Sequence, residues 1–245
     1  MASEPHPPLA EVLVTGSSVR LERDFIGIST VVLLTMGTRR VLVDAGGPAT
    51  RGTLLAGLRA RGLQPGAIDT VVLTHLHFDH VANIDLFPRA ELIVSRAEIA
   101  YAAAPHPDDA FVPDGILQRL GRRRVRVLED QAEPLDAQAV CGVTIIPAPG
   151  HTPGQLALRV EGMLEDGGGR HAGRIVLAAD AIKTPRELAT GRADLEFDRL
   201  GRAAETMAAL AEGADAIVPG HAPTLTKGPG GWASAHPVSF PLVIR

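Results

Sequence analysis

Short apolar runs and amphipathic stretches alternate along most of the chain. The apolar runs predict β-strands, because hydrophobic residues that are continuous or alternate over about four to eight positions are typical of strands that face a core. They lie at 11–14, 29–36, 40–44, 70–73, 91–94, 125–128, 143–146, 155–160, 174–178 and 214–218. A last apolar run at 240–244 favours an edge strand.

Helices are predicted where apolar residues recur at helical spacing, at 50–61, 81–86, 95–101 and 197–210. The segment Ala102 to Asp114, rich in Pro, Ala and Asp, predicts a loop insertion, and the glycine-rich segment 161–173 predicts a polar hairpin loop. Strands and helices that alternate in this way indicate a layered α/β fold.

The length of 245 residues allows one domain with a large core, so we expect a single domain over 1–245 with a loose lead-in at 1–8. Aromatic residues make up only 3% of the chain, which predicts a core of Val, Leu, Ile and Ala. A net charge of −4 argues against a nucleic-acid binder that depends on a global positive field. The arginine cluster at 119–126 is expected to be a solvated face, so nucleic acid is not an expected partner.

Cysteine use and the N-terminal segment bear on the cellular compartment. Cys141 is the only cysteine, so a disulfide within the chain is impossible and a reducing compartment is expected. The first residues lack the basic and apolar regions of a secretory signal, and no apolar run has the length of a membrane span. A cytoplasmic location is therefore the expectation.

Four metal-ligand side chains follow the predicted strand at residue 70, where the chain reads TVVLTHLHFDH. They are His75, His77, Asp79 and His80, and their imidazole and carboxylate groups suit Zn²⁺, Fe²⁺ or Mn²⁺. His75 and His77 would project to the same side of extended backbone and share one ion. Asp79 and His80, in the next turn, would serve a second ion. The alternative is a polar turn in which Asp79 caps a helix.

The same arrangement of apolar strand, turn and ligand-type residue recurs three times, at His151, Asp180 and His221. If the strands are neighbours, seven ligands converge at one edge of the fold, enough for two ions with one bridging carboxylate. Asp44, in the LVDAGG turn, either caps that turn or supports the ligands from behind. His106, in the predicted insertion, is expected to be an exposed loop histidine.

The chain resembles the metallo-β-lactamase-fold hydrolase superfamily through LVDAGG, THLHFDH, PGHTPG, VLAAD and the final PGH. The resemblance implies a four-layer αβ/βα sandwich with the site at one edge, between two sheets. It also implies a first ion on His75, His77 and His151, a second ion on Asp79, His80 and His221, and Asp180 as the bridge. Cys141 falls on no ligand motif, which separates the chain from the antibiotic-hydrolysing branch that uses a cysteine.

Two cations about 3.5–4 Å apart would lower the pKa of a bridging water, and the resulting hydroxide would attack a carbonyl carbon or a phosphorus centre. Asp79 is placed to bind a metal and carry a proton to the leaving group. Acyl-homoserine lactonases of the superfamily have a tyrosine three residues past the bridging aspartate, where this chain has Lys183. Lys183 is expected to contact a substrate carboxylate or oxyanion, with a solvent-facing lysine as the alternative.

We therefore expect a dinuclear hydrolase with two divalent ions, zinc first and Fe²⁺ or Mn²⁺ as alternatives, that cleaves a small ester, lactone or thioester. The GHTPG motif resembles the glyoxalase-II-like thioesterases. LVDAGGP and THLHFDHVANIDLFP resemble small metallo-β-lactamase-domain proteins, which include a histone pre-mRNA nuclease, so a phosphodiesterase or ribonuclease is one alternative. A mononuclear iron enzyme similar to persulfide dioxygenases, with ligands His75, His151 and Asp180, is another. A homodimer is compatible with the sequence.

Overall fold

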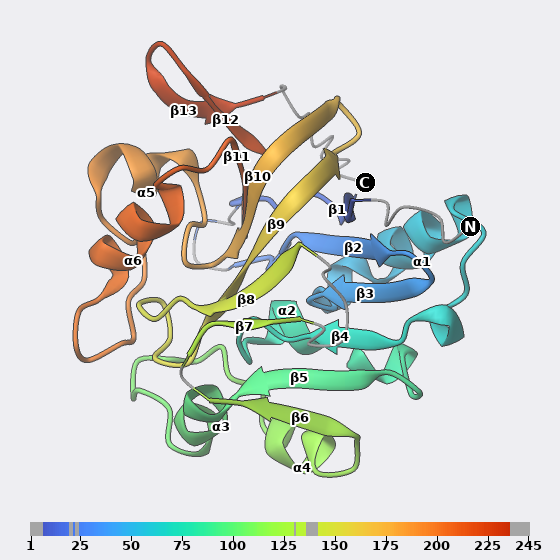
Figure 1. The fold of residues 1–245 in the computed structure, drawn as a ribbon. Coiled ribbons are helices and arrows are strands. Elements are labelled where there is room, and N and C mark those ends of the chain that lie inside the picture. The colour runs from blue at the N-terminus through green and yellow to red at the C-terminus, as the bar shows by residue number, and fades with distance from the viewer. Residues whose placement is uncertain (1–6, 20–21, 23–24, 130, 136–141, 236–245) are drawn as a thin grey trace.

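The computed structural model describes residues 7–19, 22, 25–129, 131–135 and 142–235 (Figure 1). The strands are β1 (Leu9–Val14), β2 (Val31–Met36), β3 (Arg39–Val43), β4 (Thr70–Val72), β5 (Glu91–Ser95), β6 (Val125–Leu128), β7 (Glu133–Pro134), β8 (Val143–Pro147), β9 (Leu156–Glu165), β10 (Arg170–Ala179), β11 (Ala216–Pro219), β12 (Leu225–Gly228) and β13 (Gly231–Ser234). The helices are α1 (Arg51–Ala60), α2 (Phe78–Val81), α3 (Arg96–Ala103), α4 (Ile116–Leu120), α5 (Pro185–Thr190) and α6 (Ala203–Ala211), with short 3₁₀ turns at Pro48–Thr50, Pro65–Ala67 and Ile84–Leu86.

The strands form one continuous ladder in the order β13-β12-β11-β10-β9-β1-β2-β3-β4-β5-β6, and β8 pairs with β9 and β7 beside this path. Strand β1 joins the two halves, because it pairs antiparallel with β2 and parallel with β9. Strands β3 to β6 run parallel to one another, so their carboxyl ends share one edge. The ladder therefore divides into an N-terminal half, β1 to β6, and a C-terminal half, β7 to β13.

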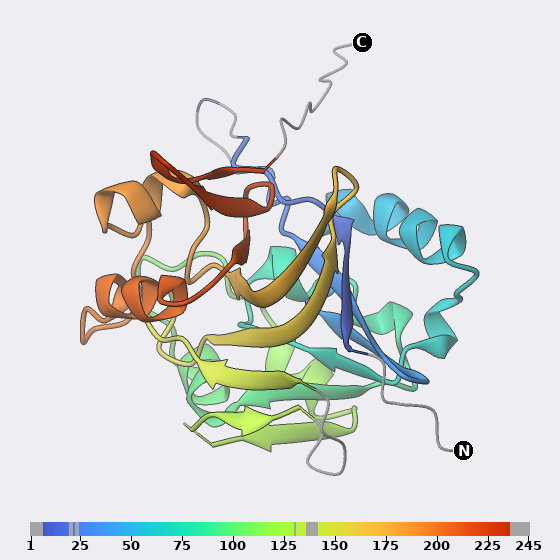
Figure 2. The same cartoon turned by 45° about the horizontal axis from the view of Figure 1, so that its top comes forward.

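Three buried apolar clusters define the layers. The middle cluster joins Val32, Val41 and Ile93 of the N-terminal half to Leu158 and Leu177 of the C-terminal half. A second cluster packs the other face of the N-terminal strands against α1, α2 and α4, and a third packs the C-terminal strands against α6. Figures 1 and 2 show α5 and α6 together on one outer side of the strands and α1 on the opposite side. The predicted four-layer αβ/βα sandwich is confirmed.

The hairpin of β9 and β10 is longer than its sequence pattern predicts. The segment expected to be a loop at 161–173 is mostly strand, and the ladder continues as far as the pair Arg170 and Glu165. The turn is confined to a few residues because Asp166 Oδ1 accepts hydrogen bonds from the backbone N–H groups of Gly168 and Gly169, each at 3.0 Å. The loop predicted at 161–173 from its polar, glycine-rich composition is therefore wrong for most of its length.

The helix predicted at 197–210 begins only at Ala203. Gly201 takes a positive φ of 65°, which breaks the helical path, and Leu200 is 74% exposed instead of lying on the apolar face. Helix α2 begins before residue 81, at Phe78, so it includes two of the candidate ligands. Helices α4 and α5 and strands β7, β12 and β13 had no sequence prediction.

Several sequence predictions fall outside the described residues, namely those for most of the lead-in at 1–8, for Cys141 and for the apolar run at 240–244. Among the residues that are described, none of the helices combines the length and apolar character needed to cross a membrane.

Candidate metal centre

The structure brings all seven predicted ligands to one edge of the sandwich. His75 and His77 lie in the segment between β4 and α2, and Asp79 and His80 lie in the short helix α2. The other three are His151 between β8 and β9, Asp180 directly after β10, and His221 two residues after the end of β11. All seven are buried.

The ligand-type atoms form three overlapping groups, and within each group all atoms lie within 4.8 Å of one another. The groups are His75, His77 and His151; His75, His80 and Asp180; and Asp79, His80 and His221. Asp180 also lies beside His151 and His221, with Oδ2 at 3.4 Å and 3.2 Å from their Nε2 atoms. The carboxylate of Asp180 is therefore the group that adjoins both halves of the cluster.

In each of the five histidines, one ring nitrogen lies within hydrogen-bond distance of an acceptor that is not one of the seven candidate ligands. The pairs are His75 Nδ1 with Thr74 Oγ1 at 3.2 Å, His77 Nε2 with Asp109 Oδ2 at 2.9 Å, His80 Nδ1 with Asp44 Oδ2 at 2.7 Å, His151 Nδ1 with the Leu195 carbonyl at 3.1 Å, and His221 Nδ1 with the Ile28 carbonyl at 3.0 Å. A neutral imidazole carries one N–H, so these contacts assign the proton to the outer nitrogen and leave a lone pair on the inner one.

With the protons assigned this way, acceptors face acceptors inside the cluster. His77 Nδ1 lies 3.0 Å from His151 Nε2, and His80 Nε2 lies 3.2 Å from Asp180 Oδ1. His75 Nε2, Asp79 Oδ2 and Asp180 Oδ1 are buried without a hydrogen-bond partner among the described atoms. Lone pairs and carboxylates this close repel one another unless a cation or extra protons lie between them. The donor set of five imidazoles and two carboxylates fits borderline divalent metals such as zinc.

Protonation is the alternative way to relieve this repulsion, and the pKa directions show where it would occur. Burial works to lower the pKa of His80, but the charges of Asp44, Asp79 and Asp180 outweigh it and raise that pKa well above its ordinary value. His221 follows the same logic, with Asp180 as the main opposing charge. Metal ions compete with protons for these nitrogens, so metal affinity is expected to fall as pH falls.

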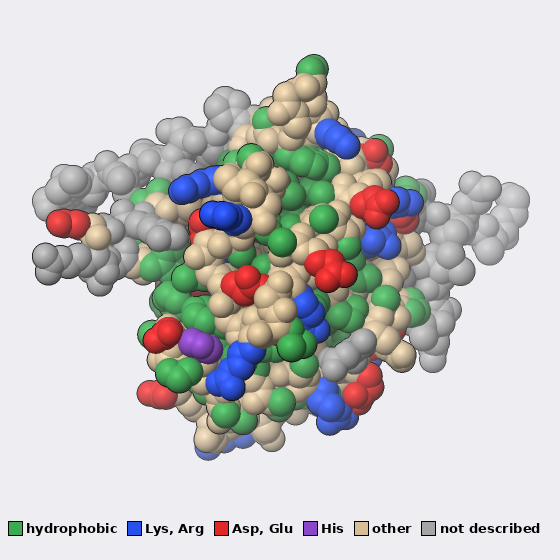
Figure 3. Space-filling model, turned by 90° about the vertical axis from the view of Figure 1, so that its left-hand side faces the viewer, with side chains coloured by type: hydrophobic (Ala, Val, Ile, Leu, Met, Phe, Trp, Pro, Cys, Tyr) green, Lys and Arg blue, Asp and Glu red, His purple; other side chains and the backbone are tan. Residues whose placement is uncertain are grey.

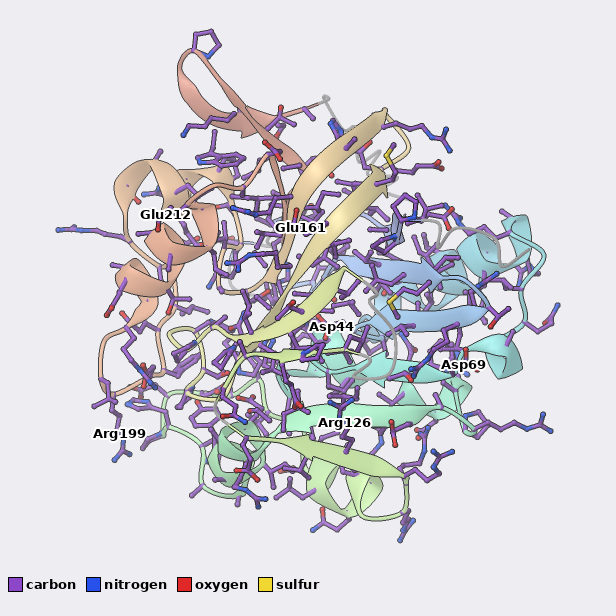
Figure 4. The ribbon with its side chains drawn as sticks, viewed as in Figure 1. Asp44, Asp69, Arg126, Glu161, Arg199 and Glu212 are labelled. Atoms are coloured by element: carbon purple, nitrogen blue, oxygen red, sulfur yellow. The ribbon has the colours of Figure 1, made fainter. Side chains whose placement is uncertain are left out.

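Two residues next to candidate ligands have strained backbone conformations. Asp44 (φ 63°) and Ala179 (φ 45°) are the non-glycine residues with positive φ in the described part of the chain. Asp44 accepts hydrogen bonds from the backbone N–H and the hydroxyl of Thr74 and also contacts His80, so it supports the ligands from behind. Asp44, labelled near the centre of Figure 4, is 1% exposed. Strain of about 1–3 kcal/mol per residue persists only where the surroundings impose it, and it is concentrated at functional sites.

Glu98 is a buried acid near the centre that sequence reasoning did not single out. It lies in the first turn of α3, where its Oε1 accepts from the Leu76 backbone N–H at 2.9 Å and its Oε2 accepts from Thr152 Oγ1 at 2.7 Å. Leu76 lies between His75 and His77, and Thr152 follows His151. Glu98 therefore joins the two segments that carry the first ligand group. The only sequence signal was the spacing of Ser95 and Glu98, which is typical of a helix N-terminus.

A pocket of about 500 Å³ opens over the centre. Five of the seven candidate ligands line it, namely His77, Asp79, His151, Asp180 and His221. Phe25, Phe111 and Leu195 form an apolar part of its wall. Lys183 lines it too, with a buried Nζ that lies 3.7 Å from Glu187 Oε1 and has no hydrogen-bond partner among the described atoms. The pocket thus combines an apolar wall and a buried ammonium beside the ligand cluster.

Three arginines of the cluster at 119–126 have partners away from the pocket. Arg119 pairs with Asp85 at 2.9 Å, and Arg126 pairs with Glu133 at 3.0 Å. Arg123 donates to three backbone carbonyls in the segment 84–90. On the face drawn in Figure 3, lysine and arginine side chains are scattered among acidic ones. His106 has a side chain that is 34% exposed, and it belongs to none of the ligand groups found among the described residues.

Comparison with known proteins agrees with this arrangement. A family model described as the metallo-beta-lactamase superfamily matches residues 25–221, which run from Phe25 at the pocket wall to the last candidate ligand. The chain belongs to the metallo-beta-lactamase superfamily. The family resemblance seen in the sequence motifs is therefore confirmed.

Similar members of the superfamily come from animals and bacteria. Metallo-beta-lactamase domain-containing protein 1 of Xenopus laevis is 29% identical over 219 residues, which cover 89% of this chain and 81% of that protein. An N-acyl homoserine lactonase of a Bacillus species is 32% identical over 127 residues, or 52% of this chain and 44% of the lactonase. A crystal structure from Thermotoga maritima, described as a candidate metallo-beta-lactamase, has a TM-score of 0.70 at 21% identity and covers 90% of this chain and 100% of that one. At that identity the match speaks for the fold alone.

Proposed function

We propose that the protein is a dinuclear metal-dependent hydrolase of a small ester, lactone or thioester. The observation that carries the proposal is the convergence of buried acceptor atoms without donors, at the floor of a pocket that also holds a buried ammonium. In this proposal His75, His77 and His151 hold one ion, Asp79, His80 and His221 hold the other, and Asp180 adjoins both. Zinc is the expected metal because the set is rich in imidazole.

Divalent ions in such a site would activate water near neutral pH and polarise a carbonyl group. The remaining work falls to side chains of the chain itself. Asp79 lines the pocket with its Oδ2 free of hydrogen bonds to the described atoms, so it is placed to take up a proton and pass it to the leaving group. Lys183, which is buried and lines the same pocket as Asp180, is placed to bind a substrate carboxylate or a developing oxyanion.

The pocket favours a substrate with an apolar part and an anionic or carbonyl part. Phe25 and Phe111 pack edge to face with their ring centres 6.2 Å apart, and they offer an aromatic wall to an acyl chain or a leaving group. The N-acyl homoserine lactonase among the relatives supports a lactone as one member of the substrate class. The arginines at 119, 123 and 126 have acids or carbonyls as partners, so they give no support to the phosphodiester alternative.

The test is hydrolysis by the zinc-loaded protein against aryl ester, lactone, thioester and bis-p-nitrophenyl phosphate substrates. We expect turnover of at least one carbonyl substrate, and we expect His77→Ala to abolish it, because that change removes a ligand from the pocket floor. His171→Ala is the matched control, since His171 lies in β10 and lines neither the pocket nor the ligand groups. Turnover that survives in a folded His77→Ala variant, or equal loss in the control, would contradict the proposal.

A further inference from the structure

The loop at 104–115 places a buried carboxylate, that of Asp109, in contact with one of the candidate ligands. Asp109 is 7% exposed, and its Oδ2 lies 2.9 Å from His77 Nε2 and accepts from the Tyr101 hydroxyl at 2.5 Å. Its second oxygen, Oδ1, accepts from the Phe111 backbone N–H at 2.9 Å. One side chain therefore contacts a candidate metal ligand and the segment that carries an aromatic residue of the pocket wall.

The contact decides which nitrogen of His77 is available to a metal. A carboxylate only accepts hydrogen bonds, so it requires the N–H of a neutral His77 to be on Nε2. The lone pair then lies on Nδ1, which is the nitrogen that faces His151 Nε2 at 3.0 Å. The Tyr101 hydroxyl strengthens this selection because it holds Oδ2 in place from the opposite element, helix α3.

The same loop builds part of the pocket. The Phe111 carbonyl accepts from the Phe78 backbone N–H at 2.9 Å, which binds the loop to the first residue of α2. The Phe111 ring lies 5.5 Å from the His77 ring and 6.4 Å from the Phe197 ring, measured between ring centres. Asp109 thus lies at the junction between the aromatic wall and the first ligand group.

We propose that Asp109 is a positioning residue that selects Nδ1 of His77 as the metal-facing nitrogen and, through its bond to Phe111, fixes the aromatic wall to the ligand cluster. The inference deepens the proposed function and rests on it, because it concerns how the same centre prepares a ligand. Partners of this kind, which hold a ligating histidine in one tautomer, typically change metal affinity about 10–100-fold when they are replaced.

Asp109→Asn is the direct test, since it keeps the shape of the side chain and reverses one contact. If the amide oxygen still accepts from the Phe111 N–H, the amide nitrogen faces His77 Nε2 and donates to it, which moves the imidazole proton to Nδ1. Asp109→Ala, which offers no acceptor at all, covers the case in which the amide turns round. Asp108→Asn is the matched control, because Asp108 is the neighbouring acid in the same loop and its side chain is 88% exposed.

Two measurements on the full chain decide the outcome. In the metal-free protein, long-range nitrogen–proton NMR correlations report the His77 tautomer. We expect Nε2–H in the wild type and in Asp108→Asn, and a shift toward Nδ1–H in Asp109→Asn. Zinc affinity, measured by competition with a chromophoric chelator, should fall about 10–100-fold for one of two ions in both Asp109 variants and stay unchanged in the control.

A wild-type His77 with its proton on Nδ1 would overturn the inference, and so would folded Asp109 variants that bind both ions with wild-type affinity or a control that loses as much. Failure of the proposed function looks different. In that case the wild-type protein itself binds no zinc or hydrolyses nothing in the panel, and the tautomer measurement still decides the role of Asp109.

Discussion

Removal of the Glu98 carboxylate should weaken the link between the two segments that carry His77 and His151. Glu98 is fully buried, and its two oxygens accept from the Leu76 N–H and the Thr152 hydroxyl. Glu98→Ala leaves both donors buried without an acceptor, at about 1–3 kcal/mol each, so we expect a loss of about 2–6 kcal/mol in the free energy of unfolding. That is a large part of the roughly 5–15 kcal/mol that stabilises a typical domain.

Glu98→Gln should recover most of this loss. The amide oxygen replaces one carboxylate oxygen as the acceptor for Leu76, and the amide nitrogen donates to Thr152 Oγ1, which can accept as well as donate. We expect the glutamine variant to lie within about 1 kcal/mol of the wild type. The recovery separates a hydrogen-bonding role from a role of the negative charge.

The difference in unfolding free energy between the wild type and Glu98→Gln should also depend on pH, in a direction that the pKa of Glu98 sets. Burial raises the pKa of Glu98 above its ordinary value of 4.5 and outweighs the lowering by Thr152 and Leu76. Between 4.5 and the raised pKa, the unfolded chain has lost the proton that the folded chain keeps, so the wild type loses stability as pH rises through this window. Glutamine does not titrate, so the stability of Glu98→Gln relative to the wild type should improve from acid pH toward neutrality.

Urea unfolding at fixed protein and saturating zinc concentrations measures these differences at two pH values. Glu212→Ala is the control, an exposed acid at the end of α6 (Figure 4), for which a change within about 0.5 kcal/mol is expected. An alanine variant within 1 kcal/mol of the wild type, roughly the worth of one hydrogen bond, would refute the reasoning. Equal losses in the alanine and glutamine variants would refute it as well.

Three further predictions concern other parts of the centre and its surroundings. Gly220→Ala would place a methyl carbon 2.1 Å from Asp180 Oδ1, so metal content by emission spectroscopy should fall below two ions per chain, and two tightly held ions would contradict the packing argument. Lys183→Met should lower kcat/KM about 10–100-fold for esters that carry a carboxylate, as expected for a hydrogen bond to a charged group, with metal content unchanged. An equal loss for neutral esters would count against anion contact. Burial works to raise the pKa of Asp198, but hydrogen bonds from Arg202 and the Leu200 N–H, together with the charge of Arg202, outweigh it and lower that pKa. The stabilisation by Asp198 is therefore present above the ordinary pKa and lost as pH falls through the lowered one. Asp198→Asn should therefore destabilise the protein near neutral pH but not at acid pH. An unfolding free energy equal to that of the wild type at both pH values would refute this.

The sequence could single out the candidate ligands because each one follows a recognisable local pattern. His75 to His80, His151, Asp180 and His221 all follow apolar runs that form β4, β8, β10 and β11. Strand ends that share an edge bring such residues together, so hydrophobic pattern and residue type were sufficient. The role of Asp44 stayed open at that level, because its contact with His80 depends on how β3 and β4 pair.

The supporting residues could not be predicted because their partners are distant in the chain. Glu98 bonds to a backbone group 22 positions away, and Asp109 contacts a ring 32 positions away. Nothing in the local pattern of an Ala- and Pro-rich loop distinguishes Asp109 from the exposed Asp108. The predicted start of helix α6 was wrong for a local reason. The apolar periodicity looked continuous through Leu200, but the positive φ of Gly201 interrupts the helical path and α6 begins only at Ala203.

The number of metal ions per chain tests the central claim most directly. The wild-type protein, loaded with zinc, dialysed and measured by emission spectroscopy against protein concentration, should hold two ions per chain, and Asp180→Ala should hold fewer. A folded wild-type protein that retains less than one ion would show that the acceptor atoms of the five histidines and two aspartates are satisfied by protons, and the account of a dinuclear hydrolase would be wrong.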